Sequence, residues 1–284
     1  MTSSLSSSAL LFERMHLQPL AHEFDTLYRS EHRYGGFGRV VRTLDPALPG
    51  EVEPFSFLSG DLLHHIADEL ALRSDQTVAD LGCGRGGPGL WLARRAGAEL
   101  VGIDCSAVAV AQARHRAIAF GMQDRSRFVV NDLTATGLAD ASASAAVSID
   151  ALQYPVDRRA AVAEARRLLR RGGRLVLTGW HPRHADDLRV PPRHRVTDWP
   201  SVLRAGGFAE IGCHTRSVWD DAYLCIYRSA LQIGDPGPDA GARRVAERGS
   251  ATPARRPPAA AGRRHCGRRL NHRFKRLSVA AIAS

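Results

Sequence analysis

A glycine turn, Gly82-Cys83-Gly84-Arg85-Gly86-Gly87, directly follows the short apolar run Val78-Ala79-Asp80-Leu81. Glycines let the backbone approach a ligand closely and adopt positive φ, and a helix that begins after such a turn presents amide donors at its N-terminus. The turn therefore predicts a nucleotide site with free amide donors. Its glycines fit both the G-x-G-x-G spacing and the dinucleotide-binding G-x-G-x-x-G spacing, so they leave the kind of nucleotide open.

Acidic side chains end the apolar runs that we expect to form strands. Asp80 closes the first run, and Asp104, Asp132 and Asp150 close three later ones. Parallel strands joined by right-handed crossovers place their carboxyl ends at one edge of a sheet, so these acids are expected to converge in one site. The alternative is that each carboxylate caps the turn after its own strand.

Several segments together resemble the class I S-adenosylmethionine (SAM) dependent methyltransferases. Asp80-Leu81-Gly82-Cys83-Gly84-Arg85-Gly86 is similar to their first motif, and Phe128-Val129-Val130-Asn131-Asp132 looks like their third strand. Ala146-Val147-Ser148-Ile149-Asp150 looks like the fourth strand, and Leu168 to Leu177 resembles the following helix, glycine turn and fifth strand. The resemblance spans roughly Phe55 to Phe208.

The resemblance implies SAM as the cofactor. It places Asp80 and the amides of the glycine turn around the methionine portion of the cofactor and Asp104 at the ribose. It places Asp132 and Leu133 at the adenine. The cofactor-binding residues expected in this way are Asp80, Gly82, Cys83, Gly84, Gly86, Asp104, Cys105, Asp132, Leu133 and Asp150.

The acceptor side is expected from two regions. An N-terminal aromatic segment resembles the lid of small-molecule methyltransferases, with Tyr28 as a catalytic and Tyr34 as a substrate-contacting candidate. Gln153 and Tyr154 follow the fourth strand and are further substrate candidates, and His181 after the fifth strand is a candidate base because histidine titrates near neutral pH. Packing of the N-terminal aromatic residues on the sheet is the alternative.

A metal site is not expected. His181, His184 and Asp187 offer ligand atoms, but Pro182 breaks helical spacing between them and no flanking pattern supports a site.

The function expected is methyl transfer from SAM to a small, apolar or aromatic metabolite. A non-catalytic relative, or a methyltransferase that acts on RNA or protein, is the alternative. Amino-directed nucleic-acid enzymes usually carry Asn/Asp-Pro-Pro-Tyr after the fourth strand, where this chain has Asp150-Ala151-Leu152-Gln153. A nicotinamide-dependent oxidoreductase of the short-chain type would need a Tyr-x-x-x-Lys pair, yet the single lysine, Lys275, lies near the C-terminus.

Alternating strand-like and helical patterns predict an α/β fold with a doubly wound, mostly parallel sheet. The final antiparallel strand of the resembled fold is not evident; Leu277 to Ile282 is the one candidate. Expected helices cover Pro19 to Ser30, Ser59 to Leu72, Gly87 to Ala96, Ala107 to Phe120, Asp157 to Arg170 and Thr197 to Ala205. Expected strands cover Thr77 to Leu81, Glu99 to Ile103, Arg127 to Asn131, Ala145 to Ile149, Arg174 to Thr178 and Ala209 to Arg216.

The formal net charge of +10 is concentrated in residues 235–284, which hold 12 Lys and Arg against 3 Asp and Glu. This basic stretch is poor in large apolar residues and is expected to be a disordered tail, either inert, altered by a shifted reading frame, or a basic arm. We therefore expect a lid or helical cap at 1–54, a SAM-binding domain at 55–234 and a tail at 235–284. Nucleic-acid binding is expected at most through the tail.

Five cysteines without C-x-x-C pairing suit a reducing compartment. The N-terminal Met1 to Ser8 lacks the basic region and apolar core of a secretory signal, and no run is long enough to span a membrane. A cytoplasmic protein that acts on a small molecule, without a membrane partner, is expected.

Overall fold

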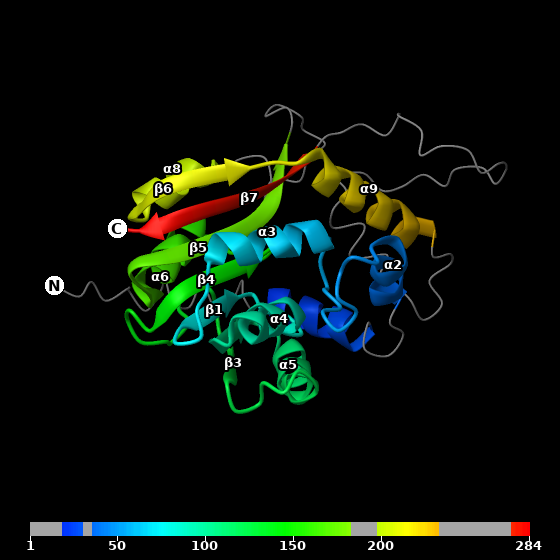
Figure 1. The fold of residues 1–284 in the computed structure, drawn as a ribbon, viewed down its shortest axis with the longest axis horizontal. Helices are drawn as coiled ribbons and strands as arrows, with labels where there is room; N and C mark the ends of the chain where they lie inside the picture. The colour runs from blue at the N-terminus through cyan, green and yellow to red at the C-terminus, as the bar shows by residue number, and fades with distance from the viewer. Residues whose placement is uncertain (1–18, 31–35, 183–197, 233–273) are drawn as a thin grey trace.

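The computed structural model describes residues 19–30, 36–182, 198–232 and 274–284. Its strands are β1 (Thr77–Leu81), β2 (Glu99–Asp104), β3 (Ser126–Val130), β4 (Ala143–Ile149), β5 (Leu169–Pro182), β6 (Phe208–His214) and β7 (Phe274–Ala283). They form one seven-stranded sheet in the order β3-β2-β1-β4-β5-β7-β6 (Figure 1). β1 to β5 pair in parallel, and β7 runs antiparallel to both β5 and β6.

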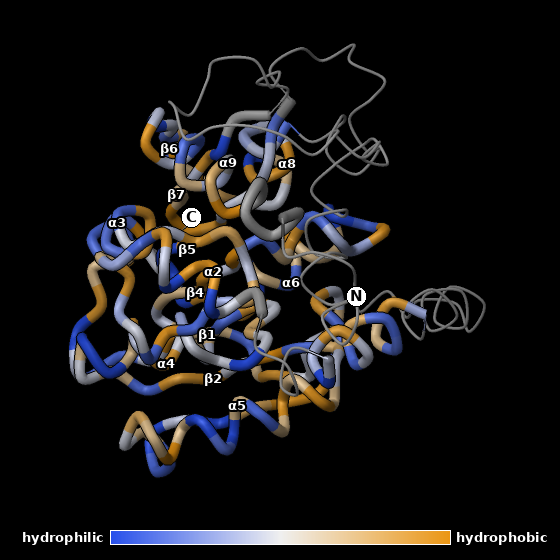
Figure 2. Tube along the Cα trace, turned by 90° about the vertical axis from the view of Figure 1, so that its right-hand side faces the viewer, coloured by the Kyte–Doolittle hydropathy of each residue, from blue (hydrophilic) through white to orange (hydrophobic). Residues whose placement is uncertain are grey.

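The helices lie in two layers around this sheet. Residues 19–30 are helical. The other helices are α2 (Gly36–Leu44), α3 (Gly60–Leu70), α4 (Gly87–Ala96), α5 (Ala107–Ala119), α6 (Arg158–Leu168), α8 (Trp199–Ala205) and α9 (Ser217–Gln232). In Figure 2, α3 and α4 lie on one side of the strands and α6 on the other. Within the described ranges, every helix is too short or too polar to span a lipid bilayer.

The sheet separates two apolar cores. α3, α4 and α5 pack with one face, and α6 and α8 pack with the other. β1 contributes to both, since Val78 belongs to the first core while Ala79 and Leu81 belong to the second. The division of β1 between the two cores follows from the alternation of side chains along a strand. In a sheet of this kind, ligand sites form at the carboxyl ends of the strands.

The final antiparallel strand is present, and the one candidate segment, Leu277 to Ile282, lies within β7. β7 inserts between β5 and β6, with Leu177 opposite Val279 and Cys213 opposite the same residue on the other side. Leu277, Val279 and Ala281 are buried in the second core. The last residues of the predicted disordered tail therefore form an interior strand, whereas residues 233–273 lie outside the described residues.

The boundary between α6 and β5 also differs from the expectation. The sequence predicts a helix to Arg170 and a strand from Arg174, but α6 ends at Leu168 and β5 begins at Leu169. Gly172 adopts φ 74°, and the pairing with β4 shifts between Ala143 and Ala145. Because α6 already ends at Leu168, Gly172 lies inside β5 and does not cap the helix. Its left-handed conformation coincides with the irregular pairing of β5 with β4.

Candidate active site

The glycine turn between β1 and α4 is shaped by close backbone approach. Gly82 and Gly84 have φ values of 81° and 51°. A Cβ atom at Gly82 would lie 2.1 Å from Cβ of Ala151, and one at Gly84 would lie 2.6 Å from the Tyr28 hydroxyl. Both positions thus require glycine for their conformation and for the space they leave.

The amides of Gly82, Gly84 and Gly86 are not spare donors, contrary to the expectation from the sequence. Gly82 N–H donates to the Ile103 carbonyl (2.8 Å), Gly84 N–H to Asp104 Oδ2 (2.8 Å) and Gly86 N–H to the Cys83 carbonyl (2.8 Å). The glycines therefore serve close approach, and hydrogen bonds to a ligand must come from side chains or from other amides.

A cavity lies beside this turn at the carboxyl ends of β1, β2, β4 and β5. Most of the residues predicted from the sequence line it, namely Tyr28, Asp80, Gly82, Cys83, Gly84, Asp104, Cys105, Asp132, Leu133, Asp150, Gln153 and Tyr154. The convergence expected from parallel strands is present. Tyr34 lies outside the described residues.

Two predicted residues are not among the described residues that line the cavity. Gly86 has φ 77°, and a Cβ there would meet Ala113 and Phe128 at 3.1 Å, so packing requires this glycine. His181 lies within β5, which continues to Pro182, and Trp180 rather than His181 lines the cavity. Adjacent strand residues point to opposite faces, which accounts for the difference.

Asp104 and Asp132 both make the turn-capping contacts that the sequence left as an alternative. Asp104 accepts from Gly84 N–H (2.8 Å) through Oδ2 and from Ser106 N–H (2.9 Å) through Oδ1. Asp132 Oδ1 accepts from the amide and the hydroxyl of Thr134 at 2.7 and 3.0 Å. A carboxylate has about four lone-pair positions, so these caps leave acceptor capacity toward the cavity.

Asp80 and Asp104 are neighbouring buried carboxylates in the cavity, and their negative charges repel each other. Burial, with the charge of Asp104 as a second cause, raises the pKa of Asp80 to about 7. Burial also raises the pKa of Asp104, against the opposing hydrogen bonds from Ser106 and Gly84. A cationic ligand placed here would relieve this repulsion.

The N-terminal helix at residues 19–30 covers the cavity. Its Phe24 and Tyr28 line the cavity, and its Asp25 accepts from Ser106 Oγ (2.5 Å) and Val108 N–H (3.2 Å) at the start of α5. Burial and the charge of Asp104 hold the pKa of Tyr28 well above its usual value. Its hydroxyl is therefore protonated at neutral pH and can donate a hydrogen bond.

A buried arginine that the sequence reasoning missed supports Asp150. Arg276 of β7 is fully buried, and its Nη1 donates to Asp150 Oδ2 at 2.8 Å. Its Nη2 donates to Thr178 Oγ1 at 3.2 Å, and its guanidinium lies 4.5 Å from the ring centroid of Trp180. The two residues are 126 positions apart in the chain, so the sequence carries no local signal for the pair.

Several buried polar atoms of the cavity have no hydrogen-bond partner among the described residues. They are Ser56 Oγ, Arg85 Nε and Gln153 Oε1. Buried polar groups are nearly always paired, so an unpaired set around one cavity indicates a polar ligand. The donor, the acceptor and the hydroxyl fit a cofactor that carries hydroxyl, amine and carboxylate groups.

Comparisons with known proteins agree with this geometry. Residues 78–173 match the family model described as "Methyltransferase domain". The chain is 31% identical over 129 residues to methyltransferase GfsG of Streptomyces halstedii, covering 45% of this chain and 46% of GfsG. It is 30% identical over 179 residues to methyltransferase phqN of Penicillium fellutanum, covering 61% and 52%. The chain thus spans about half the length of these curated relatives.

A solved structure shares the fold. Geranyl diphosphate C-methyltransferase from Streptomyces coelicolor A3(2) superimposes with a TM-score of 0.59 at 20% identity, covering 80% of this chain and 79% of that chain. The sheet order and the residues gathered at its edge agree with these matches: residues 78–173 match a methyltransferase domain, and the fold is shared with the geranyl diphosphate C-methyltransferase.

Proposed function

We propose that this chain transfers a methyl group from SAM to a small, apolar or aromatic metabolite by in-line displacement. The observation that carries the proposal is one cavity whose floor holds the strand-end acids and whose walls are aromatic. When bound, SAM supplies a methyl group already activated by a positively charged sulfur leaving group. The protein must therefore chiefly orient the reactants and exclude water.

The cofactor side is assigned to the residues of the first two strands and their loops. Asp104 retains acceptor capacity for ribose hydroxyls, and Asp132 with Leu133 lies one strand further along for the adenine. The buried Arg85 guanidinium, with Nε unpaired among the described residues, supports binding of a carboxylate such as that of the methionine portion.

The acceptor side is assigned to an aromatic wall. Phe24, Tyr28, Phe55 and Trp180 line the same cavity as the acids and can hold an apolar scaffold against the methyl group. Orientation of this kind contributes on the order of 7 to 11 kcal/mol to rate enhancement. Tyr28 acts as a hydrogen-bond donor, since its raised pKa leaves it protonated at neutral pH.

Gln153 is assigned to the polar group of the metabolite. Its Nε2 donates to the Asp150 carbonyl at 3.0 Å, which fixes the amide and leaves Oε1 as an unpaired acceptor. No catalytic role is assigned to His181, because it lies in β5 and is not among the described cavity residues.

The test is methyl transfer itself. The full chain is incubated with SAM and a panel of phenols, amines and alkenes on apolar scaffolds, and S-adenosylhomocysteine and methylated product are quantified together. We expect product with at least one acceptor, and a tenfold or greater loss of kcat/KM in Gln153→Leu. Gln123→Leu is the matched control, because Gln123 is exposed and its side-chain amide donates to the neighbouring Asp124.

SAM binding without turnover on any member of the panel would contradict the small-molecule reaction. It would favour the non-catalytic or macromolecule-directed alternative.

We also infer that the protein is cytoplasmic and acts on a free small molecule. The cysteines without disulfide spacing support this inference, as does the small net charge outside residues 235–284. Residues 1–54 are proposed to form a lid, supported by the helix at 19–30 lining the cavity.

A further inference from the structure

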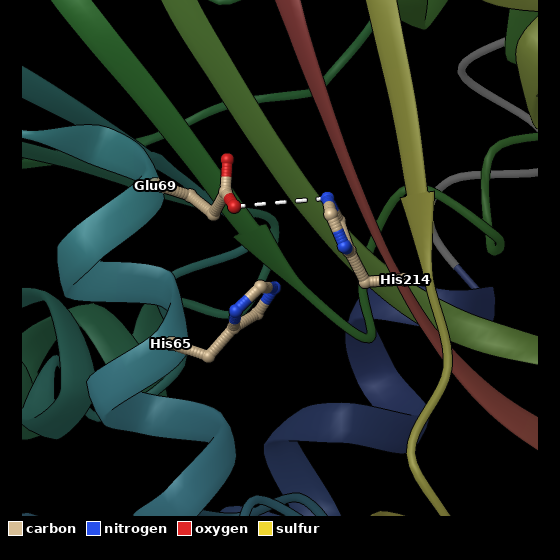
Figure 3. Close-up of side chains that lie close together, drawn as sticks. All are labelled: His65, Glu69 and His214. Atoms are coloured by element: carbon tan, nitrogen blue, oxygen red, sulfur yellow. Dashed lines mark ion pairs between the residues drawn. The ribbon is translucent and has the colours of Figure 1, made fainter.

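Two histidines and a glutamate converge on the face of the sheet that carries α3. His65, Glu69 and His214 each direct a side chain into one space between α3 and β6 (Figure 3). One potential ligand atom from each residue lies within 4.8 Å of the other two. None of the three is among the described residues that line the active-site cavity.

The fold brings these residues together from distant parts of the chain. His65 and Glu69 are four residues apart on α3, so they lie one helical turn apart on the same face. His214 is the last residue of β6. The same helix face is held to the segment after β6 by Asp61, whose Oδ1 accepts from Trp219 Nε1 (2.6 Å) and pairs with Arg216 (3.2 Å).

His65 has an unsatisfied ligand atom. The residue is only 7% exposed, and its Nε2 is buried with no hydrogen-bond partner among the described residues. Its ring packs against Trp219 and His214, with centroids 5.0 and 5.1 Å away. Buried polar atoms are nearly always paired, so a partner is expected at this position.

The charges around this group favour a cation. Glu69 lies 3.6 Å from His214 and supplies a negative charge. Arg216, the nearby cation, is already paired with Asp61.

We propose that His65, Glu69 and His214 bind a divalent transition metal, with zinc as the best-matched ion, and that the metal fastens α3 to the end of β6. Two imidazoles and one carboxylate are a common zinc ligand set, with solvent as the fourth ligand. Ligand atoms of a tetrahedral zinc lie about 3.3 Å apart, given bonds of about 2.0–2.1 Å. The ligand atoms must therefore move closer together by up to about 1.5 Å. Glu69 and His214 can make this movement because their side chains are 28% and 44% exposed.

The experiment is titration of the full chain, freed of metal, with Zn²⁺ alone by calorimetry and with Co²⁺ by visible absorption. We expect one saturable site, cobalt bands typical of tetrahedral N/O coordination, and a rise in Tm with Zn²⁺ because the ion binds only the folded state. Glu69→Gln, His214→Gln and His65→Gln should each weaken Zn²⁺ binding at this site at least tenfold.

His64→Gln and His115→Gln are the matched controls. His64 neighbours His65 but is exposed and contacts the Gly60 carbonyl, and His115 is exposed on α5. Both should bind Zn²⁺ like the parent chain. SAM affinity should be unchanged in Glu69→Gln, which separates this result from the proposed methyl transfer.

Equal Zn²⁺ binding in the parent chain and in Glu69→Gln and His214→Gln would overturn the proposal. So would the absence of saturable binding, since the three residues would then form only a surface ion pair beside a packed histidine.

Discussion

Arg276 Nη1 donates to Asp150 Oδ2 at 2.8 Å, which links the last strand of the chain to the cavity acid that follows β4. Asp150 itself adopts φ 58°, an uncommon conformation for a residue other than glycine. The ion pair and the contact of Asp150 with Thr178 (3.1 Å) therefore hold a strained backbone at the cavity wall.

Removing only one partner of the Arg276–Asp150 pair should strongly lower the free energy of unfolding. Arg276→Met leaves a buried carboxylate without its cation, and removal of one partner of a buried pair typically costs about 3 to 5 kcal/mol of unfolding free energy. Urea unfolding at pH 7 measures this loss. The double variant Asp150→Asn with Arg276→Met should recover much of it, because no charge is then left buried.

An exposed ion pair serves as the control. Arg73 and Asp75 are 71% and 72% exposed, so Arg73→Met should change stability by less than about 1 kcal/mol. Similar losses in Arg73→Met and Arg276→Met would contradict a special role for the buried pair.

The C-terminal strand should be required for folding. Ending the chain after residue 234 removes β7 from between β5 and β6 and exposes the backbone edges of both. The truncated chain should lose cooperative thermal unfolding, as followed by circular dichroism. A soluble truncated protein with the parent Tm would show that β7 is dispensable.

The sequence predicted the parts of the molecule whose signals are local. The glycine turn and the strand-end acids can be recognised from a few neighbouring residues each. The parallel topology of the sheet then places them together. β7 was missed because a short run of small and apolar residues follows a long basic stretch, where composition suggested disorder. Arg276 and His214 were missed as site residues for another reason, because their partners lie far away in the chain.

Other details depended on geometry that spacing does not encode. The amides of the glycine turn were expected to be free, but the carboxylate of Asp104 and two backbone carbonyls take them. Whether a strand-end acid caps its turn or binds a ligand is likewise invisible in sequence, and Asp104 shows that one carboxylate can have capacity for both.

Gly84→Val should abolish cofactor binding. The new Cβ would lie 2.6 Å from the Tyr28 hydroxyl at a residue with φ 51°, so the turn and the covering helix must move apart. Calorimetry with SAM should show a loss of at least a hundredfold in affinity. Gly121→Ala is the control, because Gly121 also has positive φ (63°) but has no atom within 4 Å of a new Cβ.

Unchanged SAM affinity in Gly84→Val would show that the ligand does not depend on this turn. A similar loss in Gly121→Ala would show that backbone strain alone explains the effect.

Asp80 should give the ligand-free protein a distinctive pH dependence. Its pKa is about 7 in the folded state and near 3.8 when unfolded, so the folded state binds the extra proton between these values. Stability should therefore fall as pH rises from about 4 to about 7. The decline from pH 5 to pH 8 should be on the order of 2 kcal/mol larger than in Asp80→Asn, measured by urea unfolding.

Asp75→Asn should retain the parent pH profile, because Asp75 is exposed. Identical pH profiles of stability in the parent chain and Asp80→Asn would contradict the raised pKa of Asp80.

Calorimetric titration with SAM, and separately with NADH, tests the central claim most directly. The parent chain should bind SAM at one site and show no saturable heat with NADH. Asp104→Ala should weaken SAM binding about tenfold to hundredfold, as expected when buried ligand donors lose an acceptor, while Asp75→Ala leaves it unchanged. Failure of the parent chain to bind SAM, or parent-like affinity in a folded Asp104→Ala variant, would contradict the account.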